Sequence, residues 1–372
     1  MKRIAIIENN ILATNTIRQK LTLSLIQHGF VVRVFTTGTT EELQFARNRG
    51  VDVEDVKASN QGPIEIMNYI KSIKRGLKAF KPDVCLTFTI RPAIWGNLVT
   101  RSLRIPTISN ITGTGPLFES NSMTYRIARM LYRFALKQTA LVFFQNEDDR
   151  DAFLLRGYVE SSRTALVPGS GVDTEKFSPM PAEPSCKFKF LFISRLIRDK
   201  GIMEYVEAAR ILKAKHAGIT FQVLGPYWEQ NLKSNIISPD VMQQWQSEGL
   251  IEYLGSSVDV RPFIANADCI VLPSYREGTS NVLLEAAAME RPAITCDVTG
   301  CRSVVREGFT GFLCRVRDAV DLSEKMEMMF MLSQDQRNEM GRQARQFVMR
   351  NFNKSIVIDA YLKAIREVTC SS

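Results

Sequence analysis

Short apolar segments alternate with amphipathic stretches over residues 1–150. Five of the apolar segments have the length and composition of strands: "RIAIIE", "VVRVFTT", "DVCLTFT", "IPTISNITG" and "ALVFFQN". The stretches between them predict helices near 16–28, 63–81, 93–104 and 122–138. Alternation of this kind predicts a parallel sheet that is covered by helices on both faces.

The same alternation restarts after an irregular segment. "VPGSGVDTEKFSPMPAEPSC" contains four prolines and two glycines, and it predicts a linker over 169–186. Beyond it, "FKFLFIS", "ITFQVLG", "IEYLGS", "CIVLPS" and "PAITCD" predict strands, and the chain is helical from Asp321 on. We therefore expect two doubly wound, Rossmann-like α/β domains, 1–168 and 187–354, that face a central cleft. A C-terminal helix over 355–372 follows, and one option is that it crosses back to the first domain.

The composition of the chain indicates how many cores it can form and in which cellular compartment it would function. At 372 residues with 45% hydrophobic content, the chain is long and apolar enough for two cores. Seven scattered cysteines without C-x-x-C spacing predict buried, reduced thiols, which suits a cytoplasmic protein. Neither a signal-peptide pattern nor an apolar run of membrane-spanning length is present.

The net charge of +9 is concentrated in the first half of the chain. Residues 1–180 contain 24 Lys and Arg against 16 Asp and Glu, or +8, whereas residues 181–372 contain 24 against 23, or +1. The first domain is therefore expected to meet an anionic partner or to have a basic surface only. A membrane, a nucleic acid and a phosphorylated ligand are the candidate partners.

Two glutamates stand out in "PSYREGTSNVLLEAAAMERP". Glu277 lies in the turn that leaves the predicted strand "CIVLPS", at the edge where open α/β sheets bind ligands. Gly278, Thr279 and Ser280 lead into a helix that begins near Asn281, whose free N–H groups favour an anion. Glu285 is eight residues beyond Glu277, a helical offset of about 80°. Its apolar neighbours favour a buried carboxylate with hydroxyl partners over a solvated one.

A second candidate site follows the strand "FKFLFIS". Arg195 and Lys200 stand five residues apart, before Gly201 and a helix. Two cations at the carboxyl end of a strand can hold a diphosphate without a metal ion. The alternative is a pair of surface cations in a charged loop.

These residues carry a resemblance to a known family. "ISRLIRDKGI" and "PSYREGTSNVLLEAAAMERPAI" resemble the donor-site signatures of retaining GT-B glycosyltransferases in the bacterial polysaccharide family with a Glu-x7-Glu motif, family four. "VPGSGVDTEKFSP", "VTGCRSVVREGFTGFL" and "QHGFVVRV" are similar to its interdomain segment, the stretch after its motif and an early strand. "NITGTGPLF" is similar to a Gly-x-Gly loop in the subgroup that extends undecaprenyl-diphosphate-linked sugars.

The resemblance implies roles for the candidate residues. Glu277 would contact donor-sugar hydroxyls and Glu285 the ribose of the nucleotide. Arg195 and Lys200 would neutralise the diphosphate, with help from the Gly278 and Thr279 amides. The acceptor side would lie at four residues of the Gly-x-Gly loop: Thr112, Gly113, Thr114 and Gly115.

The chain departs from the family in one respect. Many members place a histidine near the reacting sugar in the first domain, but His28 falls at an early helix end and His216 in the second domain. The residue that takes its place is not assigned.

Other signals favour ordinary structural roles. Asp149-Arg150-Asp151 is a D-x-D pair, but it opens a predicted helix, where acids complement the dipole. The first strand is not followed by G-x-G-x-x-G, so a dinucleotide oxidoreductase is not expected. We predict no cofactor and no metal site, and the basic charge comes without a nucleic-acid recognition motif.

The stretch "MTYRIARMLYRFALKQ" predicts a basic amphipathic helix. Arg126, Arg129, Arg133 and Lys137 share one helical stripe beside apolar side chains. Such a helix can lie on an anionic bilayer, and five cations of "MNYIKSIKRGLKAFKP" support this interpretation. The alternative is a core-packed helix with a solvated cationic side.

The sequence thus predicts a metal-independent hexosyl- or N-acetylhexosaminyltransferase, peripherally attached to the inner face of the plasma membrane. Its partners would be a nucleoside diphosphate sugar, with UDP favoured, a lipid-linked saccharide and an anionic membrane surface. Two alternatives remain: a nucleotide-sugar epimerase or hydrolase on a similar fold, and an inactive partner subunit.

Overall fold

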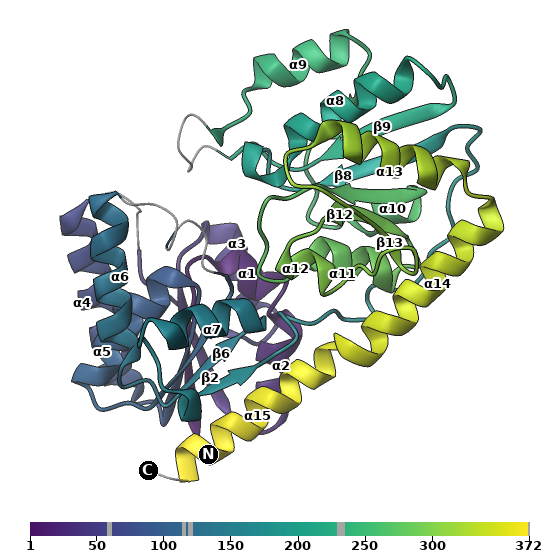
Figure 1. The fold of residues 1–372 in the computed structure, drawn as a ribbon. Helices are drawn as coiled ribbons and strands as arrows, with labels where there is room; N and C mark the ends of the chain where they lie inside the picture. Colours follow the sequence, from purple (N-terminus) through teal and green to yellow (C-terminus); the bar gives the residue numbers. More distant parts are fainter. Residues whose placement is uncertain (58–61, 114–116, 118–121, 229–234, 371–372) are drawn as a thin grey trace. The chain divides into compact units, whose positions relative to one another are not determined.

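A computed structural model describes residues 1–57, 62–113, 117, 122–228 and 235–370, and it contains two compact units. The first consists of Met1–Ser170 with Lys354–Ser372, and the second of Gly171–Asn353. Each is a parallel sheet with helices on both faces, so the prediction of two doubly wound α/β domains is confirmed (Figure 1).

The first unit has a seven-stranded sheet with the order β3-β2-β1-β4-β5-β6-β7. Its strands are β1 (Arg3–Ile7), β2 (Val31–Thr36), β3 (Asp52–Asp55), β4 (Val84–Phe88), β5 (Thr107–Ile111), β6 (Leu141–Phe144) and β7 (Thr164–Leu166). Its helices are α1 (Ile11–Asn15), α2 (Gln19–Gln27), α3 (Thr40–Arg47), α4 (Pro63–Phe80), the π-helical turn η1 (Pro92–Gly96), α5 (Asn97–Ser102), α6 (Met123–Leu136), α7 (Glu147–Leu155), η3 (Ser161–Arg163) and α15 (Lys354–Cys370).

Alternate residues of each central strand enter different cores. Ile4 and Ile6 of β1 face α2 and α15, whereas Ala5 and Ile7 face α4. The C-terminal helix α15 is part of this unit: Tyr361 is buried, and its hydroxyl accepts a hydrogen bond from Asn110 Nδ2 at 2.7 Å. The last helix of the chain therefore helps to close the core of the first domain.

The second unit has a six-stranded sheet with the order β10-β9-β8-β11-β12-β13. Its strands are β8 (Phe188–Ile193), β9 (Ile219–Leu224), β10 (Glu252–Tyr253), β11 (Cys269–Leu272), β12 (Ala293–Cys296) and β13 (Gly311–Cys314). Its helices are η4 (Arg198–Lys200), α8 (Ile202–Lys213), α9 (Pro239–Ser247), α10 (Arg261–Ala265), α11 (Asn281–Ala288), α12 (Thr299–Arg302), α13 (Ala319–Met331) and α14 (Gln334–Asn351). Helix α8 packs with α13, and α11 packs with α14 (Figure 1).

Some predicted elements differ from those observed. The helix predicted over 16–28 begins only at Gln19, because the chain breaks at Thr16 after the separate short helix α1. The sequence pattern of apolar and polar residues did not predict helix α3 or strands β3, β7 and β13. The three missed strands are all at sheet edges, where one side is exposed and the apolar run is short.

Candidate active site

Three of the predicted donor residues, Arg195, Lys200 and Glu277, lie together at the switch point of the second sheet. Strands β8 and β11 are neighbours, with Phe190 opposite Cys269, and the chain leaves the two strands in opposite directions across the sheet. The loop after β8 carries Arg195 and Lys200, and the loop after β11 carries Glu277. Open α/β sheets bind ligands at this point.

An ion pair joins the two loops. Lys200 Nζ lies 2.6 Å from Glu277 Oε1, and the two side chains are only 14% and 15% exposed. A half-buried charge that lost its partner would remain poorly solvated, so each residue holds the other in place. The sequence placed both residues at this edge but did not predict that they contact each other.

Arg195 belongs to the same electrostatic group. Its guanidinium lies 4.8 Å from the centre of the Trp228 ring, a distance at which a cation and an aromatic face attract. Desolvation lowers the pKa of Arg195, and the charge of Glu277 raises it. The guanidinium stays protonated at neutral pH because its ordinary pKa is so high. Arg195 and Lys200 thus supply two positive charges near one carboxylate.

Glycines let the loops of this edge pack backbone against backbone. A Cβ on Gly300 would lie 2.2 Å from the carbonyl oxygen of Glu277, and one on Gly201 would lie 2.1 Å from that of Pro273. Gly201 also has a φ of +76°, which side-chain-bearing residues rarely adopt. The position of Glu277 therefore depends on close contact with α12, which contains Gly300.

Hydrogen bonds further fix the Glu277 turn. The N–H of Tyr275 donates to Asp199 O at 3.0 Å, so the two loops also share a backbone bond. The hydroxyl of Tyr275 donates to Glu204 Oε1 at 2.7 Å. Burial raises the pKa of Tyr275, and the hydrogen bond to Glu204 adds to this effect, so the phenol remains a donor.

Helix α11 begins where the sequence predicted it. Ser280 is the N-cap, its hydroxyl accepts from the N–H of Leu283, and Asn281 is the first helical residue. Thr279 is buried, while Gly278 and Glu285 are half-buried. The predicted 80° offset between the glutamates is wrong as a description of their geometry. Glu277 lies three residues before the N-cap, in the turn and not on the helix.

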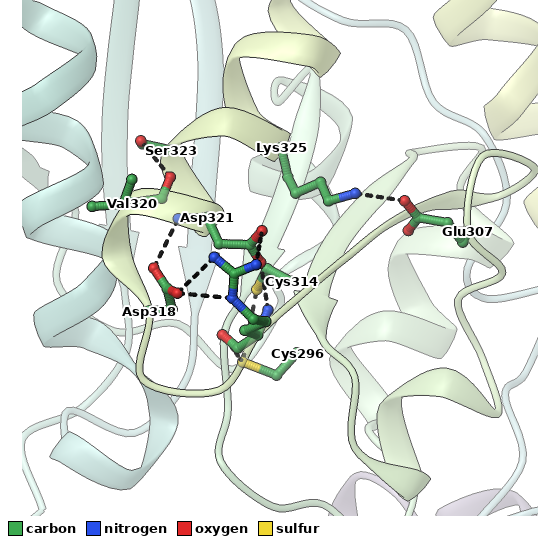
Figure 2. Close-up of polar contacts among 9 residues, drawn as sticks. Cys296, Glu307, Cys314, Asp318, Val320, Asp321, Ser323 and Lys325 are labelled. Atoms are coloured by element: carbon green, nitrogen blue, oxygen red, sulfur yellow. Dashed lines mark hydrogen bonds and ion pairs between the residues drawn. The ribbon is translucent and has the colours of Figure 1, made fainter.

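A second polar network lies at the ends of β12 and β13 (Figure 2). Arg315 binds Asp318 and Asp321, and Lys325 Nζ lies 2.7 Å from Glu307 Oε1. Cys296 and Cys314 are register partners with their sulfurs 3.8 Å apart. All seven cysteines are free thiols and five of them are buried, so the expectation of mostly buried cysteines is confirmed.

The predicted acceptor residues are only partly described. Thr112 and Gly113 follow β5 at the carboxyl edge of the first sheet, and both are half-buried. Thr114 and Gly115 lie outside the described residues. The same edge contains Thr89, which follows β4, and its N–H donates to Asn110 O at 3.3 Å.

This edge of the first sheet also contains polar groups that sequence reasoning missed. Several buried side-chain atoms have no hydrogen-bond partner among the described residues; those at this edge are Glu8 Oε2, Thr36 Oγ1, Thr89 Oγ1 and Asn110 Oδ1. Buried polar atoms are nearly always paired, so a concentration of exceptions marks a place for water or ligand. Thr89 has a φ of +70°, a rare conformation for a β-branched residue and one that is typical of functional sites.

Glu8 is the charged member of this group. It is 1% exposed, and its Oε1 lies 2.9 Å from Arg18 Nε. Burial raises the pKa of Glu8 to about 7, and the positive charge of Arg18 opposes the shift. The sequence contained one available signal: "RIAIIENN" places an acid directly after the first buried strand, at the ligand edge.

The predicted membrane residues lie on or beside α6, whose surface differs from the prediction. Arg126, Arg133 and Lys137 are exposed, whereas Arg129 is half-buried and its Nη1 donates to Leu117 O at 2.8 Å, so three of the four predicted membrane residues are exposed to solvent. The exposed stripe is apolar and flanked by the cations; it consists of Met123, Ile127, Met130 and Phe134.

The D-x-D pair occupies helix α7. Asp149 is in the first turn, and its N–H donates to the N-cap Asn146 at 2.8 Å. Asp151 lies further along and accepts from its neighbour Arg150 at 3.0 Å. Among the residues that the structure describes, no three His, Cys, Asp or Glu side chains are grouped to hold a metal ion.

Known proteins with similar sequences cover both units. Residues 9–146 match the family described as Glycosyl transferase 4-like, and residues 187–331 match that described as Glycosyl transferases group 1. The capsular polysaccharide biosynthesis glycosyltransferase CapM of Staphylococcus aureus is 30% identical over 352 residues, 85% of this chain and 90% of CapM. The chain therefore belongs to this family of glycosyltransferases.

Two further relatives have more specific names. The N,N'-diacetylbacillosaminyl-diphospho-undecaprenol alpha-1,3-N-acetylgalactosaminyltransferase of Campylobacter jejuni is 23% identical over 330 residues, 84% of each chain. The UDP-Gal:alpha-D-GlcNAc-diphosphoundecaprenol alpha-1,3-galactosyltransferase of Escherichia coli is 25% identical over 275 residues, 68% of each chain.

Solved structures support the fold. The Anabaena protein Alr3699/HepE, crystallised with UDP-glucose, has a TM-score of 0.79 over 100% of both chains at 16% sequence identity. A glycosyltransferase from Rickettsia africae has a TM-score of 0.80 at 18% identity and covers 100% of this chain and 99% of its own. The GT-B fold class is confirmed.

Proposed function

We propose that this glycosyltransferase moves a sugar from a nucleoside diphosphate donor, preferably UDP-linked, to a lipid-linked saccharide during surface polysaccharide synthesis, with retention of the anomeric configuration. The observation that carries the proposal is the Lys200–Glu277 ion pair at the switch point of the second sheet, with Arg195 beside it. The names of the Campylobacter and Escherichia relatives, which contain a diphospho-undecaprenol-linked sugar, support the acceptor class. The Escherichia name supports UDP.

The second unit would bind the donor. Lys200 and Arg195 would hold the diphosphate, and the amino end of α11, with Gly278 and Thr279 before it, would add N–H donors. Glu277 would accept hydrogen bonds from the sugar, and Glu285 from the ribose. When the diphosphate binds Lys200, its carboxylate partner becomes available to hydroxyl groups, so the ion pair would hold both side chains in position until the donor arrives.

The proposed scheme gives retention because the acceptor attacks on the face from which the diphosphate leaves. The two cations stabilise charge on the leaving diphosphate, which is the largest change of charge in the reaction. The bond from the anomeric carbon to the diphosphate oxygen would break as the acceptor oxygen bonds to that carbon on the same face. The leaving oxygen would take the acceptor proton, so this scheme needs neither a protein nucleophile nor a metal ion. A hexose or N-acetylhexosamine fits the hydrogen-bonding role of Glu277.

The first unit would bind the acceptor. Thr112 and Gly113 lie at the ligand edge of its sheet, together with the polar groups around Glu8 and Thr89. None of the described helices is long and apolar enough to cross a bilayer. The amphipathic face of α6, with its exposed apolar stripe and the cations beside it, would attach the protein to the inner face of the plasma membrane. We expect no nucleic-acid partner.

The test is a donor screen with a synthetic prenyl-diphosphate-linked sugar as acceptor. We expect turnover of one or a few UDP-sugars, with product stereochemistry, measured by NMR, that matches the donor anomer. Inversion would refute the proposed mechanism. Consumption of donor without acceptor would favour an epimerase or hydrolase, and the absence of turnover with any donor would favour an inactive subunit.

A further inference from the structure

A pocket lies at the edge of the first sheet opposite its ligand edge. It has a volume of about 380 Å³ and is formed where α5 and α6 end and where β5 and β6 begin. The polar side chains that line it are Asn97, Thr100, Arg101, Arg104, Thr107, Gln138 and Thr139. No acidic residue lines it, so its charge is wholly positive.

The two arginines of this pocket have no carboxylate partner among the described residues. Arg101 Nη1 is shielded from solvent and has no hydrogen-bond partner there. The Arg101 guanidinium lies 4.5 Å from the centre of the Phe134 ring, which leaves its edge free for acceptors. Arg101 is half-buried and Arg104 is exposed, so the shielded Nη1 is the donor that most favours an anion in this pocket.

The arginines are not needed to cap the helices that end here. The C-terminal carbonyls of α5 are taken by backbone groups: the N–H of Ile105 donates to Thr100 O at 2.9 Å, and that of Leu103 donates to Val99 O at 3.2 Å. At the end of α6, Arg163 Nη1 donates to Lys137 O at 3.2 Å. The guanidinium N–H groups of Arg101 and Arg104 are therefore available to donate hydrogen bonds to a ligand.

We propose that this pocket binds a phosphate group, carried either by an anionic lipid headgroup or by a soluble phosphate. Two guanidinium forks and the Gln138 amide offer more donors than one carboxylate can accept, whereas a phosphate has enough oxygens. The lipid source rests on the proposed membrane attachment: Phe134, which Arg101 covers, belongs to the exposed apolar stripe of α6. A lipid whose chains met that stripe would bring its phosphate to the pocket.

The first measurement is calorimetry of the full chain with inorganic phosphate and with glycerol phosphate, without donor. Arg101→Gln with Arg104→Gln should weaken binding about tenfold or more, since charge-assisted hydrogen bonds are lost. The matched control is Arg49→Gln. Arg49 is in the same unit and lies 3.6 Å from the centre of the exposed Phe45 ring, so this variant removes one positive charge and the same kind of contact outside the pocket.

The second measurement separates the two sources. Sedimentation with phosphatidylglycerol vesicles that falls in the double variant, but not in Arg49→Gln, assigns the phosphate to a lipid. Unchanged sedimentation with weakened binding of soluble phosphate assigns it to a soluble ligand. Arg101→Lys with Arg104→Lys checks that folding is intact and should restore part of the binding. The proposal is overturned if parent and double variant bind phosphate equally and sediment equally. Because no donor is present, this result is independent of whether sugar transfer occurs.

Discussion

Lys200 and Glu277 form an ion pair of 2.6 Å between loops that follow two neighbouring strands. Neither residue can reach the other without the parallel pairing of β8 and β11, because they are 77 residues apart in sequence. The position of these two candidate donor-site residues therefore depends on the pairing of β8 with β11. The donor diphosphate and Glu277 would compete for the ammonium group of Lys200. The charge of Glu277 and the position of its turn can be changed by different substitutions and tested separately.

Replacement of Glu277 by Gln should abolish transfer while UDP still binds. The carboxylate is assigned to the sugar and not to the nucleotide, so we expect kcat to fall by about 100-fold or more, with the affinity for UDP changed much less. Calorimetry with UDP and a transfer assay on the same preparation measure both quantities. Joint loss of UDP binding and activity would place Glu277 at the diphosphate instead.

The control for this variant is Glu307→Gln. Glu307 forms another glutamate–lysine pair in the same unit, with Lys325 Nζ at 2.7 Å (Figure 2). Its side chain is 46% exposed, against 15% for Glu277. Surface pairs contribute little to stability, so this variant should keep both activity and UDP binding. A similar loss in both variants would show that the effect of Glu277→Gln is structural.

Gly300→Ala should impair the enzyme without touching any charged group. The added Cβ would lie 2.2 Å from Glu277 O and 2.6 Å from Gly278 O, so the turn must move. We expect a loss of roughly 1–3 kcal/mol in stability, as for other overpacked sites, together with reduced kcat. Gly218→Ala is the control, because nothing lies within 4 Å of its Cβ position. Thermal unfolding and transfer rates are measured for both variants. If Gly300→Ala and Gly218→Ala give the same values, the assigned role of Gly300 is contradicted.

Chelation should leave the rate nearly unchanged. Arg195 and Lys200 supply the positive charge that a divalent ion supplies in other transferases, so EDTA should alter kcat by no more than about twofold. Asp149→Asn with Asp151→Asn should be equally harmless, since these residues contact Asn146 and Arg150. A strict requirement for magnesium or manganese would contradict the scheme and return attention to the D-x-D pair.

The sequence predicted the donor half of the candidate site because that half is local. Strand, turn and helix N-terminus follow one another within "CIVLPSYREGTSNVLLEAAA", and a parallel sheet has only one edge at which such turns can bind a ligand. What it could not provide is contact between loops distant in sequence. The Lys200–Glu277 pair and the backing of Glu277 by Gly300 both arise from tertiary packing.

The central strands were predicted for a similar reason. Three of the four edge strands, β3, β7 and β13, were missed, whereas the edge strand β10 was predicted. A buried parallel strand such as β4 is a continuous apolar run, whereas β3 has the sequence DVED and one exposed side. The group around Glu8 was also missed. Its members come from four different strand ends, and each alone resembles an ordinary core or turn residue.

Glu8 should make the first unit less stable as the pH rises. Its pKa is about 7 in the folded chain and 4.5 in the reference state, so the folded state holds this proton more tightly. The resulting stability is fully present below about pH 4.5 and is lost as the pH rises through 7. The slope is at most about 1.4 kcal/mol per pH unit. Arg18 opposes the shift, and the buried Tyr69 and Tyr361 also interact with Glu8.

The measurement is thermal unfolding between pH 5 and pH 8. Glu8→Gln removes the titrating group, so the decline in melting temperature over this range should be smaller than in the parent. The comparison concerns the slope, because loss of the charge partner of Arg18 lowers stability at every pH. Equal slopes in the parent and in Glu8→Gln would contradict a raised pKa at this residue.

The last prediction concerns α6 and the bilayer. Arg126, Arg133 and Lys137 are exposed cations beside the apolar stripe, and each is worth roughly 1 kcal/mol near an anionic surface at low salt. Their sum of about 3 kcal/mol supports reversible attachment that salt weakens. Arg126→Glu with Arg133→Glu should therefore release the protein from anionic liposomes, as measured by co-sedimentation. It should also slow transfer to a lipid-linked acceptor more than transfer to a soluble one.

The apolar stripe allows a second test of the same surface. Ile127→Ser with Met130→Ser keeps every charge but removes apolar area that the bilayer would cover, so binding should fall at high salt as well as at low salt. Arg129→Gln is the control, because Arg129 donates to Leu117 O and is not free to meet lipid. If the charge-reversal variant sediments like the parent, then α6 does not contact the membrane. Its exposed apolar residues would then need a different partner.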